Sequence, residues 1–211
     1  MWSDPTLSRT VRGRAAHVPL DVYVAFLDTP DVTAAAARFR GLASYEIQAL
    51  DDGRYLASDG VSARGPAQVL QRQPRRVVVL SRGEHTSPLA RTISGSALTV
   101  IDVGPERHGV TPTLVAYVCI DNPLAASSRA NARPDLGFIA DRKLRRGNAR
   151  HRGVAEWAVD PSGGFCDWLV REPLPPARRA PDYRLPSRRA HARTGSPLGS
   201  VQSPDPAIGD S

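Results

Sequence analysis

The sequence predicts an α+β fold in which a long antiparallel β-meander is followed by a long C-terminal helix. Between Tyr45 and Ile120 apolar residues alternate with a period of two, and turn residues separate the runs, as in consecutive half-buried strands. Before and after this region, apolar residues recur at helical spacing. The 211 residues suffice for one domain, and their content of 41% apolar and 23% charged residues is typical of globular proteins.

Two short helices are expected before the meander. An extended stretch at residues 9–18 predicts a first strand, and residues 21–27 predict a compact apolar helix. Thr29 and Pro30 then supply a hydroxyl cap and a first-turn proline for a second helix, which Gly41 ends. The face of this helix that is expected to be buried holds Val32, Ala35, Ala36 and Phe39.

The meander itself divides into strands at its turn residues. Gly53 supplies the positive φ of a tight hairpin, and Gly95 interrupts an alternating run, which predicts a bulge or a bend there. The expected strands lie at residues 45–49, 54–57, 61–71, 75–84, 89–103 and 111–120.

The helical period returns after the meander. A short helix is expected at Asn122-Pro123, and Pro134 is expected to break anything that continues through it. Asp135 then caps a helix over residues 136–158. Its expected inward residues are Leu136, Ile139, Ala140, Leu144, Gly147, His151, Val154, Ala155 and Ala158. A last short helix presents Phe165, Trp168 and Leu169.

The chain therefore divides into a folded domain at residues 9–171 and a tail at residues 172–211. The tail is rich in Pro, Arg and Ser and poor in large apolar residues. Such a segment buries too little surface to offset the entropy of ordering, so we expect it to be disordered.

The net charge of +7 is unevenly distributed. All 28 basic residues except Lys143 are arginine, which is typical of GC-rich bacterial coding. Residues 1–121 carry a net charge of +1 and residues 122–211 a net charge of +6. The basic run at 142–152 can attract nucleic acid or anionic lipid, although such runs are more often solvated helix faces. Few aromatic residues lie among the arginines, so any nucleic-acid binding is expected to be weak, non-specific and salt-sensitive.

The sequence lacks the motifs of several common enzyme classes. No phosphate-loop, dinucleotide-binding, zincin or hydrolase-elbow pattern occurs. The five histidines are scattered, so neither a metal site nor a cofactor is expected. Two cysteines give no disulfide framework, and no run approaches the ~18 apolar residues of a membrane span. We therefore expect a cytoplasmic protein.

One segment carries a family resemblance. Residues 18–30 read VPLDVYVAFLDTP, and further similarities lie in the GRY that begins at Gly53, the RRVV at Arg75 and the TISG at Thr92. The first segment resembles the P-x-x-V-[FY]-x-F-L-x-D-P-x opening of the START-like, helix-grip (SRPBCC) superfamily, and the resemblance covers residues 9–158. It implies a curved sheet that grips the long helix around an apolar cavity, which binds lipids, polyketides or other hydrophobic molecules. The resemblance carries over no catalytic residue.

Five residues are candidates for contacting a ligand in such a cavity. Ala67 and Ala97 are small, and small residues between a sheet and a helix leave either close approach or empty volume. Tyr117 and Arg91 are polar groups that could orient a ligand if their strand faces point inward; the alternatives are a core tyrosine and an edge-strand arginine. His85 could face the cavity or lie on the surface at a hairpin end.

The expected function is thus the binding of a small hydrophobic molecule. One alternative is an enzyme of the polyketide cyclase or dehydratase kind, for which Glu84, His85, Tyr117 and Arg91 are the candidate groups. Glu84 and His85 are neighbours on a strand and point to opposite faces, so they cannot work as one acid–base pair without a bulge. Weak, non-specific nucleic-acid binding through the arginine-rich C-terminal half is another alternative.

Overall fold

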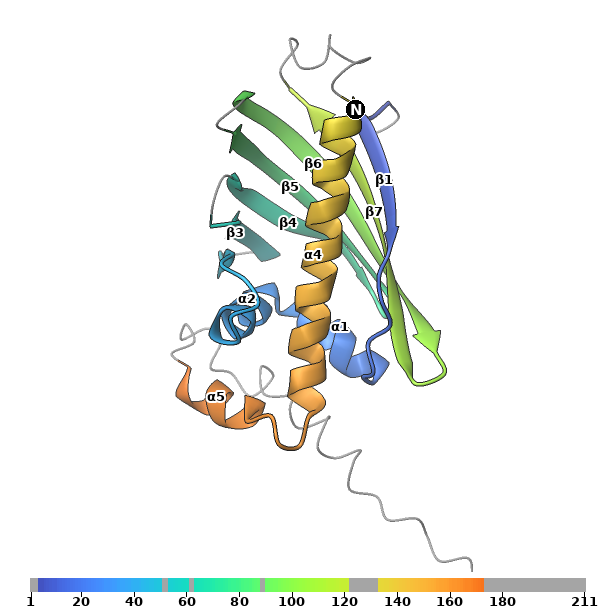
Figure 1. Cartoon of the computed structure of the whole chain (residues 1–211), viewed down its shortest axis with the longest axis vertical. Helices are drawn as coiled ribbons and strands as arrows, with labels where there is room; N and C mark the ends of the chain where they lie inside the picture. Colours follow the sequence, from blue (N-terminus) through green and yellow to red (C-terminus); the bar gives the residue numbers. More distant parts are fainter. Residues whose placement is uncertain (1–3, 51–52, 61–62, 88–89, 122–132, 173–211) are drawn as a thin grey trace, which may run out of the picture.

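A seven-stranded antiparallel sheet and a long helix that crosses it make up the domain (Figure 1). The computed structural model describes residues 4–50, 53–60, 63–87, 90–121 and 133–172. The strands are β1 (Leu7–Arg12), β2 (Glu46–Ala49), β3 (Arg54–Ser58), β4 (Ala63–Gln73), β5 (Arg76–Ser87), β6 (Ala90–Glu106) and β7 (Gly109–Ile120). The helices are α1 (Leu20–Asp28), α2 (Pro30–Phe39), α4 (Arg133–Val159) and α5 (Phe165–Arg171). The predicted α+β class is confirmed.

The order of the strands follows the chain with one exception. Strands β2 to β7 pair in sequence, as a meander does, and β1 pairs with β7 to give the order β1-β7-β6-β5-β4-β3-β2. All pairs are antiparallel, with Leu7 opposite Val118 at one end of β1. The first strand therefore lies next to the last one, on the side of the sheet where α4 begins (Figure 1).

One face of the sheet is directed towards α4, and we call it the inner face. On β1, the Nε atom of Arg9 lies 3.7 Å from Oδ1 of Asp141 on the helix. On β6, Val103 belongs to the same buried cluster as Val154 of α4. Because residues opposite one another in a ladder share a face, the pairing register assigns the remaining strand residues to the inner or the outer face.

Glycines in three adjacent strands bring their backbones unusually close. Gly83 of β5 pairs with Gly95 of β6. A Cβ atom at Gly95 would lie 2.7 Å from the carbonyl oxygen of Cys119, and one at Gly65 would lie 1.9 Å from that of Arg82. This close approach accompanies the curvature of the sheet. Of the two alternatives predicted at Gly95, a bulge or a bend, the bulge is wrong, because the ladder keeps its register there and the irregularities lie at Val69/Gln71 and His85/Ser87 instead.

The two short helices form as expected, with two corrections in α2. The hydroxyl cap predicted at Thr29 is wrong, because the Thr29 side chain donates back to the carbonyl oxygen of Ala25 at 2.9 Å and makes no capping hydrogen bond to α2. Pro30 occupies the first turn of this helix, and Gly41 follows its end with a φ of +66°. Val32 and Ala36 are buried, but Phe39, which was predicted to be buried, is 63% exposed. Its ring stacks on the Trp157 ring at a centroid distance of 5.8 Å, so it covers the core from outside.

The long helix α4 starts earlier than the sequence suggested. Pro134 was expected to break the helix but lies in its first turn, where a missing N–H removes no helical hydrogen bond. Ile139 and Gly147 were expected to face inward and are exposed. The side chain of Leu136 lies outside the described residues. The expected helix at Asn122-Pro123 lies there as well.

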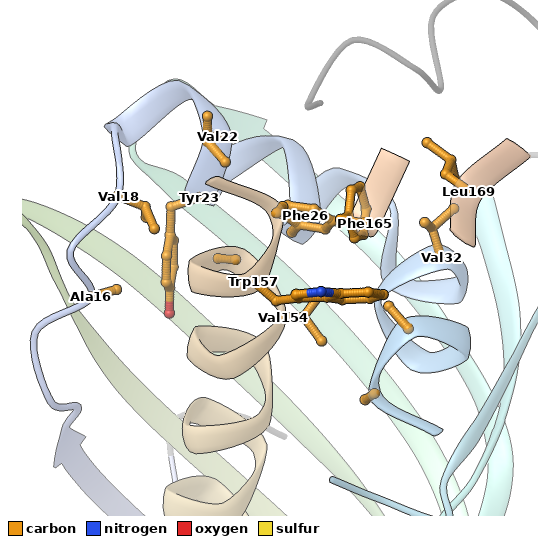
Figure 2. Close-up of a cluster of buried hydrophobic side chains, with 14 of the residues drawn as sticks. Ala16, Val18, Val22, Tyr23, Phe26, Val32, Val154, Trp157, Phe165 and Leu169 are labelled. Atoms are coloured by element: carbon orange, nitrogen blue, oxygen red, sulfur yellow. The ribbon is translucent and has the colours of Figure 1, made fainter. Parts of the chain in front are cut away.

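The tightly packed core occupies one end of the molecule, where α1, α2 and α5 surround the C-terminal half of α4 (Figure 2). Trp157 of α4 lies at its centre, with ring centroids 5.0 Å from Phe165 and 5.6 Å from Trp168. Phe26 of α1 packs on Phe165 at 5.5 Å. The predicted buried face of the last helix is therefore confirmed. None of the helices in the described ranges is long and apolar enough to cross a membrane.

The expectation of a disordered tail concerns residues that, beyond Glu172, the structure does not describe. We predict that truncation after Arg178 changes the melting temperature by less than about 2 °C, because the removed segment offers few apolar anchors. Thermal denaturation of the full-length and truncated chains measures this difference. A fall of about 5 °C or more would mean that the tail packs on the domain.

Candidate functional site

A buried polar cluster marks the level at which the tight core ends. The Tyr23 hydroxyl donates a hydrogen bond to Oδ1 of Asn148, over 3.2 Å. Asn148 is only 7% exposed and lies next to Gly13, where a Cβ atom would be 2.3 Å from the Asn148 amide nitrogen. Figure 2 shows the Tyr23 ring with its hydroxyl directed away from Phe26 and Phe165. The cluster therefore pins α1 and the end of β1 to the middle of α4.

His151 completes this cluster from the next turn of α4. Its Nε2 atom lies 3.2 Å from the carbonyl oxygen of Tyr23, and its ring packs edge-on against the Tyr23 ring at 4.4 Å. A carbonyl can only accept, so Nε2 must carry the hydrogen and Nδ1 is unprotonated in the neutral ring. Burial lowers the pKa of His151 to about 4. Burial also raises the pKa of the Tyr23 hydroxyl, so both groups are neutral near pH 7.

This histidine gives the folded state a defined pH dependence. Its pKa is about 4 in the folded chain against an ordinary value of 6.5. The unfolded chain therefore binds the proton first as pH falls. The contribution of His151 is fully present above about pH 6.5 and is lost between that value and about pH 4, with a total on the order of 3 kcal/mol. Denaturant unfolding at pH 7 and pH 5 measures the loss.

Two variants isolate this effect from the carboxylates that titrate in the same range. His151→Gln keeps an N–H donor for the Tyr23 carbonyl but cannot be protonated, so its stability should fall less than that of the wild type between pH 7 and pH 5. His108→Gln, at an exposed position, is the matched control and should fall as the wild type does. An equal fall in all three proteins would assign the pH dependence to other groups.

Beyond the polar cluster, the inner face of the sheet carries mainly small and apolar residues that are only partly covered. The inward residues of α4 show the same change: Val154 and Ala158 are fully buried, whereas Ala140 and Leu144 nearer its start are half-buried. On β6, Val103 is buried while Ala97 is half-buried. We call the partly covered part of the sheet the open half. Its residues are Ala67 of β4, Val79 of β5, Ala97 and Thr99 of β6, and Val118 of β7.

Ion pairs connect α4 to both sides of the open half. At one side, Arg9 of β1 pairs with Asp141 at 3.7 Å. At the other side, Nζ of Lys143 lies 3.1 Å from Oδ2 of Asp59, just after β3. Both pairs are partly exposed, so each adds little to stability. Among the described residues, these two pairs link the N-terminal half of α4 to the strands on either side of the open half.

The five residues predicted to contact a ligand fall in different places. Ala67 and Ala97 lie on the inner face, in one row that runs through Ser81 between them. His85 lies on the same face, near the far end of β5, and is half-buried. Tyr117 pairs with Leu98 and Ser8 and so lies on the outer face, away from α4. The side chain of Arg91 is outside the described part of the chain.

Two of the candidate acid–base groups lie on opposite faces of β5. Glu84 pairs with Arg64 and is exposed on the outer face, whereas His85 pairs with Ala63 on the inner one. The predicted separation of these neighbours agrees with this register. Among the described residues, no three His, Cys, Asp or Glu side chains are grouped so that they could hold a metal ion.

Sequence reasoning missed the most specific polar contacts of the molecule. Asn148 lies within the helix predicted over residues 136–158, but it is not among the residues expected to face inward. Its position three residues before His151 places both side chains on one face of α4, which is the signal that could have identified the cluster. Their partner Tyr23 is separated from Asn148 by 125 positions and could not be inferred from spacing.

Comparisons with known proteins give similarity to solved structures only. No family model matches the chain, and no curated protein matches it. An uncharacterized protein from Rhizobium leguminosarum aligns over 71% of this chain and 94% of its own, with 14% identity and a TM-score of 0.48. A conserved protein from Geobacillus kaustophilus aligns over 70% and 93%, with 15% identity and a TM-score of 0.48.

Two further similar structures have more specific names. Ara h 8.0201 aligns over 71% of this chain and 98% of its own, with 11% identity and a TM-score of 0.48. The di-domain ARO/CYC protein BexL from the BE-7585A biosynthetic pathway aligns over 73% of this chain and 50% of its own, with 16% identity and a TM-score of 0.42.

Proposed function

We propose that the chain binds a small hydrophobic molecule, lipid-like or polyketide-like, between the open half of the inner face and the N-terminal half of α4. The observation that supports this proposal is the change in burial along both elements. Side chains that would form the centre of an ordinary sheet–helix core, among them Ala67, Ala97 and Val118, are only half-buried here. A ligand at this place would cover them, and apolar surface that is removed from water contributes ~25 cal/mol per Å².

Residue size and burial together support a ligand rather than a closer approach of the helix. Ala67 and Ala97 on the sheet and Ala140 on α4 are small, and small residues allow either close approach or empty volume between two layers. All three are only half-buried, so the layers do not cover one another completely here. The polar cluster of Tyr23, Asn148 and His151 connects α4 to α1 at the border of the core. The proposed site therefore ends at this cluster, on the side that faces the core. The helix-grip family that residues 18–30 resemble would use the same place for its ligands.

Probe binding tests the proposal directly. The full-length chain is titrated with a fluorescent fatty acid and with a naphthalene-type probe, and native mass spectrometry of the purified protein looks for a co-purifying molecule. We expect saturable binding of at least one probe. Ala67→Phe and Ala97→Phe would fill the proposed site, so each should weaken probe binding by about tenfold or more, which corresponds to a loss of ~1.4 kcal/mol or more.

A neighbouring position provides the matched control. Gln68 follows Ala67 on β4 but is exposed on the outer face, so Gln68→Phe should bind the probe as the wild type does. If the wild type binds neither probe, or if both inner-face variants bind as well as Gln68→Phe, then no hydrophobic molecule binds at this place. Melting temperatures of the three variants show whether a loss of binding reflects unfolding.

The cyclase or dehydratase alternative receives less support from the geometry. It needs an acid or a base beside the bound molecule, and of its candidates Glu84 and Tyr117 lie on the outer face. His85 remains on the inner face, at the far end of β5. We therefore propose binding without a catalytic step.

A further inference from the structure

We propose that the outer side of the N-terminal half of α4 docks on a membrane surface that carries anionic phospholipids. The residues of this docking face are Phe138, Ile139, Arg142, Arg145 and Arg146. The proposal does not depend on ligand binding by the inner face, because it uses the opposite side of the helix.

The docking face is continuous along about two and a half turns of α4. Phe138, Arg142 and Arg145 follow one another at spacings of four and three, which places them on one side of a helix. Arg146 lies one turn after Arg142, and Ile139 lies beside Phe138. In Figure 1 this part of α4 crosses in front of the sheet, so its outer side is directed away from the strands.

No acidic side chain in the described part of the chain neutralises the arginines of the docking face. Arg142, Arg145 and Arg146 are exposed, and none of them forms an ion pair with another described residue. The other basic side chains nearby are engaged: Lys143 pairs with Asp59, and Arg152 lies 4.0 Å from Glu156. Among the residues of this part of the helix whose side chains are described, the one acidic residue, Asp141, pairs with Arg9. The outer side of α4 is therefore locally cationic.

The same face also exposes two large apolar side chains. Phe138 is 67% exposed and Ile139 is 38% exposed. Helices that lie on membranes combine such residues with arginines, because the apolar groups enter the boundary of the acyl chains while the guanidinium groups bind lipid phosphates. Each basic residue close to an anionic surface contributes about fivefold to affinity at physiological ionic strength.

This combination favours a lipid surface over nucleic acid. The arginines alone would suit either polyanion. The phosphates of a nucleic-acid duplex, however, are exposed to water, and a duplex has no hydrocarbon layer into which Phe138 and Ile139 could insert. Strand binding through stacking uses several aromatic rings along a groove, and this face has only Phe138. The occupant that matches both the charge and the exposed apolar groups is an anionic bilayer.

Vesicle binding by the full-length chain tests the proposal. Co-sedimentation is measured with vesicles of phosphatidylcholine alone and with vesicles that contain about one-third phosphatidylglycerol. We expect binding to the anionic vesicles at least about tenfold tighter than to the neutral ones, and weaker binding at high salt. The triple variant Arg142→Gln/Arg145→Gln/Arg146→Gln should lose about tenfold or more, and Phe138→Ser about threefold or more.

Matched controls remove the same groups elsewhere on the surface. Arg14→Gln/Arg64→Gln/Arg107→Gln deletes three exposed arginines outside α4, and Leu70→Ser removes an apolar side chain that is 51% exposed on β4. Both should bind anionic vesicles within about twofold of the wild type. Equal losses in the two triple variants would show that net charge alone attracts the vesicles, which would overturn the proposal.

A titration with a duplex oligonucleotide forms the last arm. If the duplex binds more tightly than the vesicles, depends on the same three arginines and is insensitive to Phe138→Ser, the face is a nucleic-acid surface and the proposal is wrong. The result that supports it is vesicle binding that needs both the arginines and Phe138. Because every substituted residue is exposed, unchanged melting temperatures are expected throughout.

Discussion

Replacement of Trp157 by alanine is expected to lower the free energy of unfolding by about 3–5 kcal/mol. Trp157 is only 5% exposed and stands between the rings of Phe165 and Trp168. Its indole N–H donates to the carbonyl oxygen of Gly163, in the connection to α5. The substitution would leave a cavity among four elements, and α5 would lose the side chain on which it packs. Urea unfolding of both proteins measures the difference.

Phe138 provides the control on the same helix. Its ring is 67% exposed, so Phe138→Ala should change the free energy of unfolding by less than about 0.5 kcal/mol. Similar losses in the two variants would contradict the assignment of the core to the end of the molecule that α5 covers.

Replacement of Gly109 by alanine is expected to cost about 3 kcal/mol through the backbone alone. Gly109 has a φ of +152°, which side-chain-bearing residues rarely adopt. A Cβ atom there would also lie 1.9 Å from the carbonyl oxygen of Ala16. That carbonyl accepts from the Val110 N–H at 3.0 Å, and Ala16 donates back to Val110 at 2.8 Å. The substitution would therefore separate two buried residues of the core.

Replacement of Gly147 on α4 by alanine should raise the free energy of unfolding, whereas the same replacement at Gly109 should lower it. Gly147 is exposed within a helix, and a Cβ atom there would meet nothing within 4 Å. Gly147→Ala is thus expected to stabilise the domain by about 0.5–1 kcal/mol, because alanine loses less backbone entropy in a helix. Thermal or urea unfolding of both variants checks the two signs. A stable Gly109→Ala protein would mean that the β6–β7 turn can adopt another conformation.

The fold class was predictable because periodicity and turn chemistry agree over most of the chain. The alternation from Tyr45 to Ile120 became six consecutive strands, and the aromatic spacing of Phe165 and Trp168 became the buried face of α5. The hydrophobic period alone did not predict burial correctly at the ends of helices. Phe39 has the spacing of a core residue, but it lies in the last turn of α2, where its ring meets Trp157 from the solvent side.

The candidate site was only partly predictable, for a related reason. Alternation shows that Tyr117 and Cys119 share a face, but a period of two does not say which face meets the helix. That follows from tertiary contacts with α4: Ala116 pairs with Arg9, which contacts Asp141, and Val103 shares a buried cluster with Val154. The Tyr23–Asn148 contact depends likewise on tertiary structure, since it joins two helices that are separated by 125 positions in the sequence.

The irregularity in β4 changes the phase of that strand. Val69 pairs with Val79, but Arg72 pairs with Val77, so one extra residue lies between them and inverts the alternation. Before this point Ala67 faces the open half, and after it Arg72 takes the inward position. There Arg72 pairs with Asp28 at the end of α1, and its Nη2 atom lies 3.4 Å from the Tyr55 hydroxyl.

A single inserted residue thus changes the character of the inward side chains along one strand, from apolar to charged. In its first part the inward residues, such as Ala67, are apolar and line the proposed ligand site. In its last part the inward residue Arg72 forms an ion pair with Asp28 of α1. An uninterrupted strand would have directed Arg72 into solvent and left Asp28 without this partner. The position of the extra residue in β4, and not only the composition of the strand, therefore determines where its inward side chains change from lining the proposed ligand site to contacting α1.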